Sequence, residues 1–454
     1  LGDVYKRQQL FIKGLEGLFV MTIPLRTFRR GIHPPANKFT KDVPLEQFPT
    51  PERVFVSLSQ HIGAPAKAVV AVGDHVDEGQ LIGEANGFVS ANVFSSVSGT
   101  VKSICTLPTA TGGEATHIEI ENDYLYTKRT LPPLKNPTKD DIIKRVKDAG
   151  IVGMGGATFP THVKLMPKDK VDTLIINGAE CEPYITCDYR LFMEEADTVL
   201  KGVELLLTAL EINHAYIGIE ANKPLAIKHL ADIVPENVDV MRLKAKYPQG
   251  AEKQLIYATT HRIVPTGELP AKVGCVVCNA HTAYAIAKAV YEGEPCYKRA
   301  MTVSGGGVKK RGNFWVRNGV QYQYIYDVCR GNKSEELTRK VVSGGPMMGF
   351  AQASLTPACT KGSSCLLFMT DKEFNLNPTT PCISCGKCII NCPMSLVPRE
   401  IEKAVEKDDF ESTFKMGVLN CIECGACSYS CPAKRPLVQA MRLAKKEIKA
   451  RGIK

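Results

Sequence analysis

The chain of 454 residues lacks any run of about 18 consecutive uncharged apolar residues, the length that a membrane-spanning helix requires. The most apolar stretch near its start, residues 11–25, is interrupted by Lys13, Glu16 and Pro24, and no small-residue cleavage site follows it. We therefore expect no membrane-spanning segment in the chain itself. Binding to a membrane-embedded partner is compatible with this absence.

Aromatic residues are also scarce, at 7% of the chain, and Trp315 is the only tryptophan. No basic stretch carries the interleaved aromatic residues that nucleic-acid-binding surfaces use, so we expect no nucleic-acid partner. Apolar residues at 44% and charged residues at 23% are ordinary for a globular protein. The length alone predicts about three domains.

Cysteine, by contrast, is abundant: the chain has 17, and eight of them form two copies of the run C-x₂-C-x₂-C-x₃-C-P. This run is typical of four-iron clusters in two-cluster ferredoxins, where the fourth cysteine ligates the other cluster. Structural zinc sites use paired C-x₂₋₄-C knuckles instead, and so many thiols indicate a reducing cytosol. We predict two [4Fe-4S] clusters, the first held by Cys382, Cys385, Cys388 and Cys431 and the second by Cys421, Cys424, Cys427 and Cys392.

Short β-prone runs alternate with Gly-Asp turns from Val54 to Ile120, which indicates a small all-β module with strands such as Val69–Val72. The pattern resembles the hammerhead sandwich of biotinyl and lipoyl domains. Those carriers modify a lysine at a hairpin tip, whereas no lysine lies between Lys67 and Lys102. We therefore expect a docking or structural module rather than a swinging arm.

A proline-rich linker at residues 131–137 is followed by a region in which strands and helices alternate, which predicts an α/β sheet with helices on its faces. Thr138 precedes an acidic first turn and is the expected start of a helix that reaches Ala149. The expected strands are 171–176, 214–219 and 239–244, and the expected helices are 194–209, 223–234 and 282–292.

Short strands and glycine turns return between residues 300 and 348, and segments of helix-forming composition surround the two cysteine runs at 398–407, 411–419 and 436–449. The expected fold class is therefore multidomain α/β and α+β, with a helical ferredoxin-type domain for the clusters. Its expected parts are a poorly ordered N-terminal extension at 1–24, a β hammerhead (barrel-sandwich) domain at 25–130, an α/β domain at 138–297, a small β-rich domain at 298–355 and the two-cluster domain at 370–454.

A second chemical site is indicated by the closely spaced Gly153, Gly155 and Gly156, with Phe159 and Lys164 shortly after them. Such glycines let backbone N–H groups approach an anion or a flat ring without a Cβ clash, and a lysine can supply charge to a phosphate. The loop matches neither the P-loop, since no Gly-Lys-Ser/Thr follows, nor the dinucleotide-binding fingerprint, since no strand leads into G-x-G-x-x-G. An ordinary glycine turn is the alternative interpretation.

Polar side chains gather directly after the expected strand 171–176, where Asn177, Glu180, Cys181 and Glu182 follow one another closely. Open α/β sheets place their ligands at this carboxyl end of the strands. A solvated acidic turn explains the local sequence equally well.

Taken in order, these residues resemble the flavin subunit of respiratory complex I, which carries G-x-G-G-x-x-F-P-x-x-x-K, N-x-x-E-x-E-P, a tyrosine-containing G-x-E segment and N-x-x-T. The resemblance implies FMN across the glycine loop, with NAD(H) as the substrate that stacks on the flavin, and an SLBB β-grasp fold for 298–355. It implies catalytic roles in the nicotinamide pocket for Glu180 and Glu182. The cofactor-binding residues that it implies are Gly153, Gly155, Gly156, Phe159, Lys164, Asn177, Tyr247, Gly250, Glu252, Asn279 and Thr282.

The order of the domains distinguishes this chain from the complex I subunit, which has one cluster and no N-terminal hammerhead. Hammerhead, flavin domain, β-grasp domain and paired-cluster domain, in this order, resemble the RnfC family of the ion-translocating Rnf electron-transport complexes from about residue 25 onwards. Where complex I has N-x-D-E-x-E-P, this chain has the neutral Ala179 in place of the aspartate, and Cys181 stands between the two glutamates, so it departs from the family beside the expected nicotinamide contact.

The resemblance implies a peripheral NADH-side subunit of a ferredoxin:NAD⁺ oxidoreductase at the cytoplasmic face of the cell membrane. Its partners would be other Rnf-type subunits, including integral membrane proteins and a ferredoxin-like subunit. Hydride would move between NAD(H) and FMN, and single electrons through both clusters, because a flavin exchanges either one or two electrons. Two alternatives are a soluble flavin/iron-sulfur corrinoid (cobalamin) reductase and a non-catalytic electron carrier.

Overall fold

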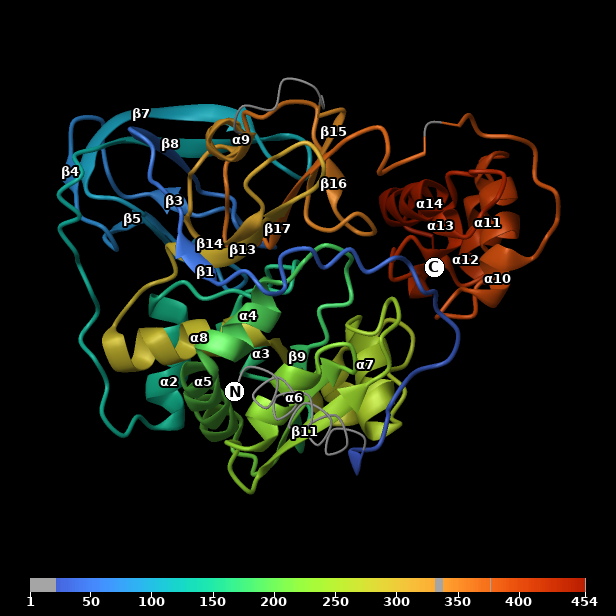
Figure 1. Cartoon of the computed structure of the whole chain (residues 1–454), viewed down its shortest axis with the longest axis horizontal. Coiled ribbons are helices and arrows are strands. Elements are labelled where there is room, and N and C mark those ends of the chain that lie inside the picture. Colours follow the sequence, from blue (N-terminus) through green and yellow to red (C-terminus); the bar gives the residue numbers. More distant parts are fainter. Residues whose placement is uncertain (1–21, 331–337, 376, 454) are drawn as a thin grey trace, which may run out of the picture.

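The structure is a computed structural model that describes residues 22–330, 338–375 and 377–453. A parallel sheet with its helices occupies one half of the molecule, two β-rich modules occupy the other half, and a helical C-terminal domain stands at one end (Figure 1). No helix within the described ranges is long and apolar enough to cross a bilayer. Most of the N-terminal extension expected at 1–24 lies outside the described residues.

The N-terminal β-module consists of two small antiparallel sheets, with strand orders β2-β8-β7-β4 and β3-β5-β6. The run Val69–Val72, expected to be a strand, is a loop in which Val69 and Val72 are exposed. The Asp74 carboxylate accepts a hydrogen bond from the Ala71 N–H group and so starts a turn in place of a ladder. The strands are β2 (Arg53–Ser57), β3 (Lys67–Ala68), β4 (His75–Val76), β5 (Leu81–Glu84), β6 (Val93–Phe94), β7 (Gly99–Pro108) and β8 (Glu114–Asn122).

The α/β domain is built on a four-stranded parallel sheet with the order β11-β10-β9-β12. Alternate side chains of its strands point to opposite faces, so Leu174 and Ile176 pack with the helices α5 and α8, whereas Ile175 packs with α7. The strands are β9 (Thr173–Gly178), β10 (Ala215–Glu220), β11 (Val238–Leu243) and β12 (Cys275–Asn279). The helices are α2 (Lys139–Asp148), α3 (Thr161–Lys164), α4 (Cys187–Glu194), α5 (Ala196–Leu210), α6 (Pro224–Ala231), α7 (Glu252–Thr260) and α8 (Ala280–Ala287), with a 3₁₀ turn at Pro270–Val273 and a π turn at Lys288–Glu292.

The expected strands and helices of this domain are confirmed within a few residues, and the helix expected at 194–209 is α5. The preceding helix α4, which ends at Glu194, was not predicted. Thr138 caps α2 as expected: its hydroxyl accepts from the Asp141 N–H group while the Asp141 carboxylate accepts from the Thr138 N–H group. Strand β12 and helix α7 were not predicted.

The second β-rich module is a six-stranded mixed sheet with the order β1-β14-β13-β17-β15-β16 and one helix, α9 (Tyr322–Arg330). Its strand β17 (Cys365–Met369) is central and fully buried, although it lies beyond the end expected for this module at residue 355. The other strands are β1 (Leu45–Gln47), β13 (Lys298–Ser304), β14 (Gly312–Arg317), β15 (Lys340–Ser343) and β16 (Phe350–Ala351). This sheet shares one hydrophobic core with the N-terminal β-module.

The segment 26–47 lies outside the sheets of the N-terminal β-module, although it was expected to belong to the same domain. Arg26 pairs with Leu243 at the edge of the parallel sheet, and Ile32 pairs with Tyr247. Strand β1 at the end of the segment then pairs with β14. The segment therefore crosses from the α/β domain to the mixed sheet before the β-module begins.

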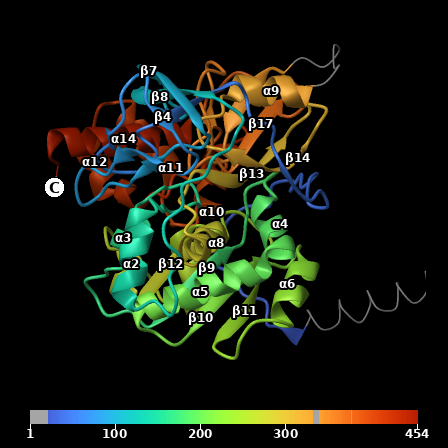
Figure 2. The same ribbon diagram turned by 90° about the vertical axis from the view of Figure 1, so that its left-hand side faces the viewer.

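All regular elements among the described residues 377–453 of the C-terminal domain are helices, and the domain stands behind the β-rich modules in Figure 2. Each cysteine run enters a short helix through a glycine with positive φ, Gly386 before α10 (Lys387–Ile390) and Gly425 before α13 (Ala426–Tyr429). Its remaining helices are α11 (Pro398–Val405), α12 (Phe410–Lys415), the 3₁₀ turn Val418–Asn420 and α14 (Leu437–Arg451).

Candidate functional site

The glycine loop connects the end of α2 to α3 and is closed on itself by backbone hydrogen bonds. Gly153 N–H donates to the Phe159 carbonyl at 2.8 Å, and Thr158 N–H donates to the Gly153 carbonyl at 3.1 Å. Gly155 and Gly156 are exposed at its tip. Gly156 has a φ of +105° and no atom within 4 Å of the place a Cβ would take. The loop thus presents bare backbone to open space, as a flat ring or a phosphate requires.

The polar residues expected to bind the cofactor meet beside this loop at the carboxyl ends of β9 and β12. Asn177 and Asn279 are partners on the two adjacent strands. The Asn177 amide donates to the Gly250 carbonyl at 2.8 Å, and a Cβ on Gly155 would lie 3.4 Å from Asn279. Thr282 fixes the loop, because its hydroxyl accepts from the Met154 N–H group at 3.0 Å.

Lys164 points from α3 toward the same strand ends. Its ammonium group donates to Glu252 at 3.1 Å and to the Val277 carbonyl at 2.9 Å. Burial opposes the charge on this lysine, but Glu252 more than compensates and raises its pKa. The site therefore offers three kinds of hydrogen-bond donor: the exposed backbone of the glycine loop, the Lys164 ammonium group and the amides at the strand ends. Such a donor set fits the phosphate and ring of FMN.

Glu180 lies in an ionic network that the sequence did not reveal. Its carboxylate lies 3.6 Å from the Lys223 ammonium and 4.0 Å from the Lys38 ammonium, and it accepts from the Asp188 N–H group at 2.7 Å. Its side chain is 2% exposed, and burial raises its pKa to about 7. In this arrangement Glu180 orders the turn after β9 and does not face an open pocket.

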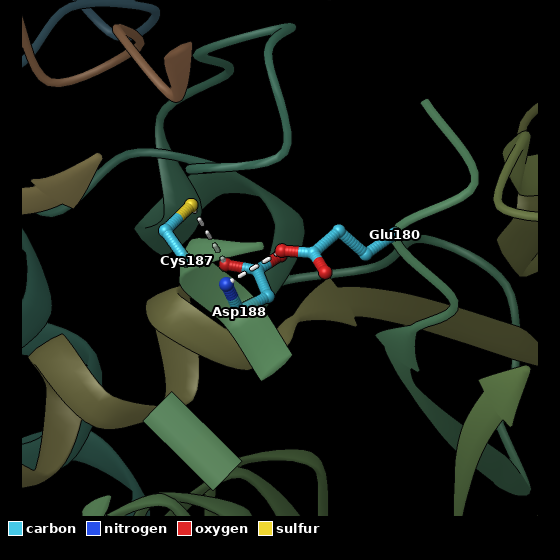
Figure 3. A group of neighbouring side chains, drawn as sticks. All are labelled: Glu180, Cys187 and Asp188. Carbon is cyan, nitrogen blue, oxygen red and sulfur yellow. Dashed lines mark hydrogen bonds between the residues drawn. The ribbon is translucent and has the colours of Figure 1, made fainter. Parts of the chain in front are cut away.

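Three potential metal ligands, Glu180, Cys187 and Asp188, lie together in this network (Figure 3). Two lysine ammonium groups already flank the glutamate, so an added cation would be repelled. Burial and the nearby carboxylates also raise the pKa of the Cys187 thiol, which disfavours the thiolate that a metal needs. The cluster is therefore better explained as structural.

Lys38 was also missed, and no motif marks it within the proline- and lysine-rich segment 24–50. Its ammonium group donates to the carbonyls of Glu180, Glu182 and Ile185 at 2.7, 2.8 and 2.5 Å. One lysine thereby fixes the backbone of the turn that carries both predicted catalytic glutamates.

Glu182 and Tyr247 lie where the α/β domain meets its neighbours: Glu182 bonds the loop between β15 and β16 of the mixed sheet, and Tyr247 bonds the C-terminal domain. The Glu182 carboxylate accepts from the Met347 and Met348 N–H groups at 3.2 and 2.8 Å, and burial raises its pKa to about 7. The Tyr247 hydroxyl donates to the Cys424 carbonyl at 2.8 Å. The structure therefore groups these two residues at the domain junction.

The second cysteine run and the last cysteine of the first run line one pocket in the C-terminal domain, at Cys392, Cys421, Cys424 and Cys427. Burial, together with the neighbouring thiols, raises the pKa of both Cys424 and Cys427 to about 12. At neutral pH such thiols become ligands only when a cation takes the place of their protons, which iron would do. This donor set fits a [4Fe-4S] cluster and has the crossed membership expected from the spacing.

The remaining four cysteines lie at the surface of the same domain. Cys385 is exposed, and Cys382, Cys388 and Cys431 are partly exposed. Burial and the nearby Cys431 raise the pKa of Cys388. The two runs also share a local geometry, because the Ser384 and Glu423 N–H groups each donate to the first sulfur of their run at 3.4 Å. Such N–H···S bonds tune cluster potentials.

Three family models match the chain: the Nuo51 FMN-binding domain at 146–288, the RnfC barrel sandwich hybrid domain at 26–124 and the 4Fe-4S dicluster domain at 375–432. The chain is 45% identical over 437 residues to a subunit of the proton-translocating ferredoxin:NAD(+) oxidoreductase complex of Clostridium ljungdahlii, covering 94% of this chain and 95% of that protein. It is 44% identical to the Na(+)-translocating counterpart of Acetobacterium woodii, covering 94% and 98%. An NAD⁺-reducing [NiFe]-hydrogenase structure aligns with a TM-score of 0.48 and 17% identity, covering 69% of this chain and 61% of that one, which supports no inference.

Proposed function

Because this chain belongs to the RnfC family of the ion-translocating ferredoxin:NAD⁺ oxidoreductase complexes, we propose that it is the NADH-side subunit of such a complex. It carries an FMN-binding domain and a 4Fe-4S dicluster domain, and it is an oxidoreductase subunit. The observation that carries the proposal is the buried junction of these two domains, where Tyr247 donates to the Cys424 carbonyl.

The glycine-loop residues hold FMN in this proposal. Lys164 places a positive charge beside the exposed loop at Gly155 and Gly156, and Asn177 and Asn279 supply the amides at the strand ends. When bound, FMN exchanges a hydride with NAD(H) and single electrons with the clusters. Lys38 and Lys223 keep the turn after the strand in place, so the flavin meets a preformed site.

The cluster cysteines hold two [4Fe-4S] clusters in this proposal. Cys392, Cys421, Cys424 and Cys427 bind one cluster in the pocket that they line, and the surface cysteines bind the other. Single electrons pass through both clusters to partner subunits, including membrane-embedded ones, at the cytoplasmic face of the membrane. The near-complete overlap with two relatives named as complex subunits favours this function over a corrinoid reductase.

Anaerobic reconstitution of the full chain with FMN, iron and sulfide tests the proposal. About one FMN and about eight irons per chain are expected, since each cluster contains four irons. NADH should then bleach the flavin absorbance and produce EPR signals from reduced clusters. A flavin that NADH fails to bleach would leave the non-catalytic carrier as the function, and absence of co-purifying hydrophobic subunits from the native source would favour the corrinoid reductase.

A further inference from the structure

One end of the N-terminal β-module packs against the glycine loop of the α/β domain. The Ile62 N–H group of the module donates to the Thr158 carbonyl in this loop at 3.3 Å. The Asn92 side-chain amide of the module donates to the Asp148 carbonyl, at the end of α2 just before the loop, at 3.1 Å. The module therefore borders the proposed flavin site.

A buried lysine joins this end of the module to the start of the glycine loop. Lys361, which precedes β17, is buried, and its ammonium group donates to the Asn92 carbonyl at 2.5 Å and to the Gly150 carbonyl at 2.7 Å. The two backbones are also in close contact, since a Cβ on Gly150 would lie 2.3 Å from the Asn92 carbonyl oxygen. The module is thus held in a fixed position beside the loop.

The hairpin loop at 85–92, which joins β5 to β6, brings Phe88 to the same border. The Phe88 carbonyl accepts a hydrogen bond at 3.3 Å from Nε2 of His162 on α3, so this nitrogen carries the proton, because a carbonyl can only accept. The Phe88 and His162 rings meet edge to face, with their centroids 6.4 Å apart. Because α3 directly follows the glycine loop, Phe88 lies beside the end of that loop.

Phe88 and Ile62 expose more than half of their area although the backbone of each is hydrogen-bonded to the α/β domain. Phe88 is 67% exposed and Ile62 is 53% exposed. Their two segments are neighbours, because the Ala64 N–H group donates to the Val89 carbonyl at 3.1 Å. A single exposed apolar residue needs no explanation, but two of them on adjacent segments beside a proposed cofactor loop form a candidate binding surface.

The charges around this surface suit an uncharged ring that is linked to an anion. The hairpin loop has no charged residue, and the carboxylate nearest to it in sequence, Glu84, lies opposite Lys67 in the β3–β5 pair. Burial lowers the pKa of His162, and the Lys147 ammonium on α2 lowers it further, so a cation lies near this border. The adenosine diphosphate half of NAD(H) has matching chemistry, because its uncharged purine is joined through ribose to an anionic pyrophosphate.

We propose that Phe88 and Ile62 of the N-terminal β-module bind the adenine ring of NAD(H), with the Phe88 ring stacked on the purine. This inference rests on the proposed function, in which the nicotinamide ring meets FMN at the glycine loop. The adenosine half of the dinucleotide is then left to bind on a surface that adjoins the loop, and the module supplies that surface. Stacking on an aromatic side chain suits a purine because every base has a π-face. The module thus takes part in nucleotide recognition from outside the FMN-binding domain.

Steady-state oxidation of NADH by ferricyanide, catalysed by the reconstituted full chain, tests this surface against reduced nicotinamide mononucleotide, which lacks the adenosine half. Phe88→Ala should raise the KM for NADH about tenfold with kcat unchanged, because stacking of the distant purine is the same in the ground and transition states. The KM for the mononucleotide should stay unchanged, and Phe88→Trp should keep the KM for NADH near that of the wild type. Tyr124→Ala is the matched control and should change neither KM, since Tyr124 is a 52% exposed aromatic residue that follows β8 in the same module.

Calorimetric titration of the FMN-loaded chain with ADP-ribose gives a second readout that does not depend on turnover. The dissociation constant should be about tenfold higher in Phe88→Ala, with FMN content unchanged. If NADH fails to bleach the wild-type flavin, the proposed function is wrong and this inference falls with it. If bleaching is normal but Phe88→Ala and Tyr124→Ala behave alike, or if Phe88→Ala weakens NADH and the mononucleotide equally, only the adenine surface is wrong.

Discussion

Glu182 holds a proton more tightly in the folded chain than it would in an unfolded one. Burial raises its pKa to about 7 even though two N–H groups donate to its carboxylate, and an unfolded glutamate has a pKa of about 4.3. The stability contributed by this proton is complete below about pH 4.3 and is lost as the pH rises through about 7. Between these values the free energy of unfolding should fall as the pH rises.

Glu182→Gln should reduce this pH dependence, because glutamine does not titrate. Relative to the wild type, the slope of the free energy of unfolding between about pH 5 and pH 7 should flatten by up to about 1.4 kcal/mol per pH unit. Denaturant unfolding of the protein at several pH values, under anaerobic conditions, measures this slope. Glu400→Gln, at an exposed glutamate on α11, is the control, and the same slope in both variants would contradict the shifted pKa of Glu182.

The contribution of Lys164 to FMN binding can be tested with a single substitution. A charge-assisted hydrogen bond contributes about 1.5–3 kcal/mol, so Lys164→Met should weaken FMN binding by about tenfold to a hundredfold. Lys144→Met removes an exposed lysine from α2 and should leave FMN affinity unchanged. Quenching of FMN fluorescence on binding gives both dissociation constants, and equal affinities would remove Lys164 from the site.

At the scale of elements, the crossing of α5 and α8 positions part of the flavin site. Gly202 of α5 allows the close approach, since a Cβ there would lie 1.9 Å from the Ala283 carbonyl oxygen of α8. That oxygen is a backbone atom and cannot rotate away. Helix α8 is capped by Asn279 and carries Thr282, which holds the glycine loop. A displaced α8 would therefore disturb the loop.

Gly202→Ala should destabilise the chain and weaken FMN binding together. Alanine gains about 1 kcal/mol of helix propensity, but overpacking against a backbone atom costs about 1–3 kcal/mol, so the net effect is a loss. Lys201→Ala, at the exposed neighbouring position of the same helix, is the control and should be neutral or slightly stabilising. Thermal melts and FMN titrations of both variants measure the two effects. A Gly202→Ala protein that is more stable than the wild type would contradict the close crossing.

Elements with strong local signals could be predicted from the sequence, and short apolar ones could not. The capped start of α2 and the strands β9 to β11 follow from capping and hydrophobic pattern. Val69–Val72 has β-branched residues but is diverted by the Asp74 turn. Strand β17 is a short buried run whose partners lie more than 20 residues away in sequence, so only the assembled sheet reveals it.

The candidate site, too, could be predicted from the sequence only where its signals are local. Spacing alone indicated the crossed cysteine sets and the glycine loop, because those signals are local. The positions of Lys38 and Lys223 around Glu180, and the turn of Glu182 toward the loop 344–349, depend on contacts between distant segments. No local pattern carries that information.

At the scale of the whole molecule, the segment 26–47 binds the parts to one another. It pairs with the α/β sheet at Arg26 and with Tyr247 at Ile32, and Arg30 donates to the Ile389 carbonyl of the C-terminal domain. Lys38 then fixes the turn after β9, and strand β1 extends the mixed sheet. The junction between the α/β domain and the cysteine pocket of the C-terminal domain is thus held by a third segment as well as by the two domains.

Because Tyr247 of the α/β domain packs with Cys424, the removal of one cluster should affect reduction by NADH differently from the removal of the other. Cys385→Ala and Cys424→Ala should each remove about four of about eight irons. NADH should still reduce the cluster left in Cys385→Ala, because the pocket at Cys424 that holds it stays beside Tyr247 and Cys181. In Cys424→Ala the remaining cluster is held by Cys382, Cys385, Cys388 and Cys431, none of which packs with Tyr247, so its reduction by NADH should be slowed at least tenfold.

Freeze-quench EPR after mixing with NADH measures the two rates, and matched FMN content shows that the α/β domain is intact in both variants. A folding defect in Cys424→Ala would appear as lost FMN, in which case Tyr247→Phe, which removes the hydrogen bond to the Cys424 carbonyl, takes its place. Equal reduction rates of the two remaining clusters would mean that the flavin serves both sites in parallel.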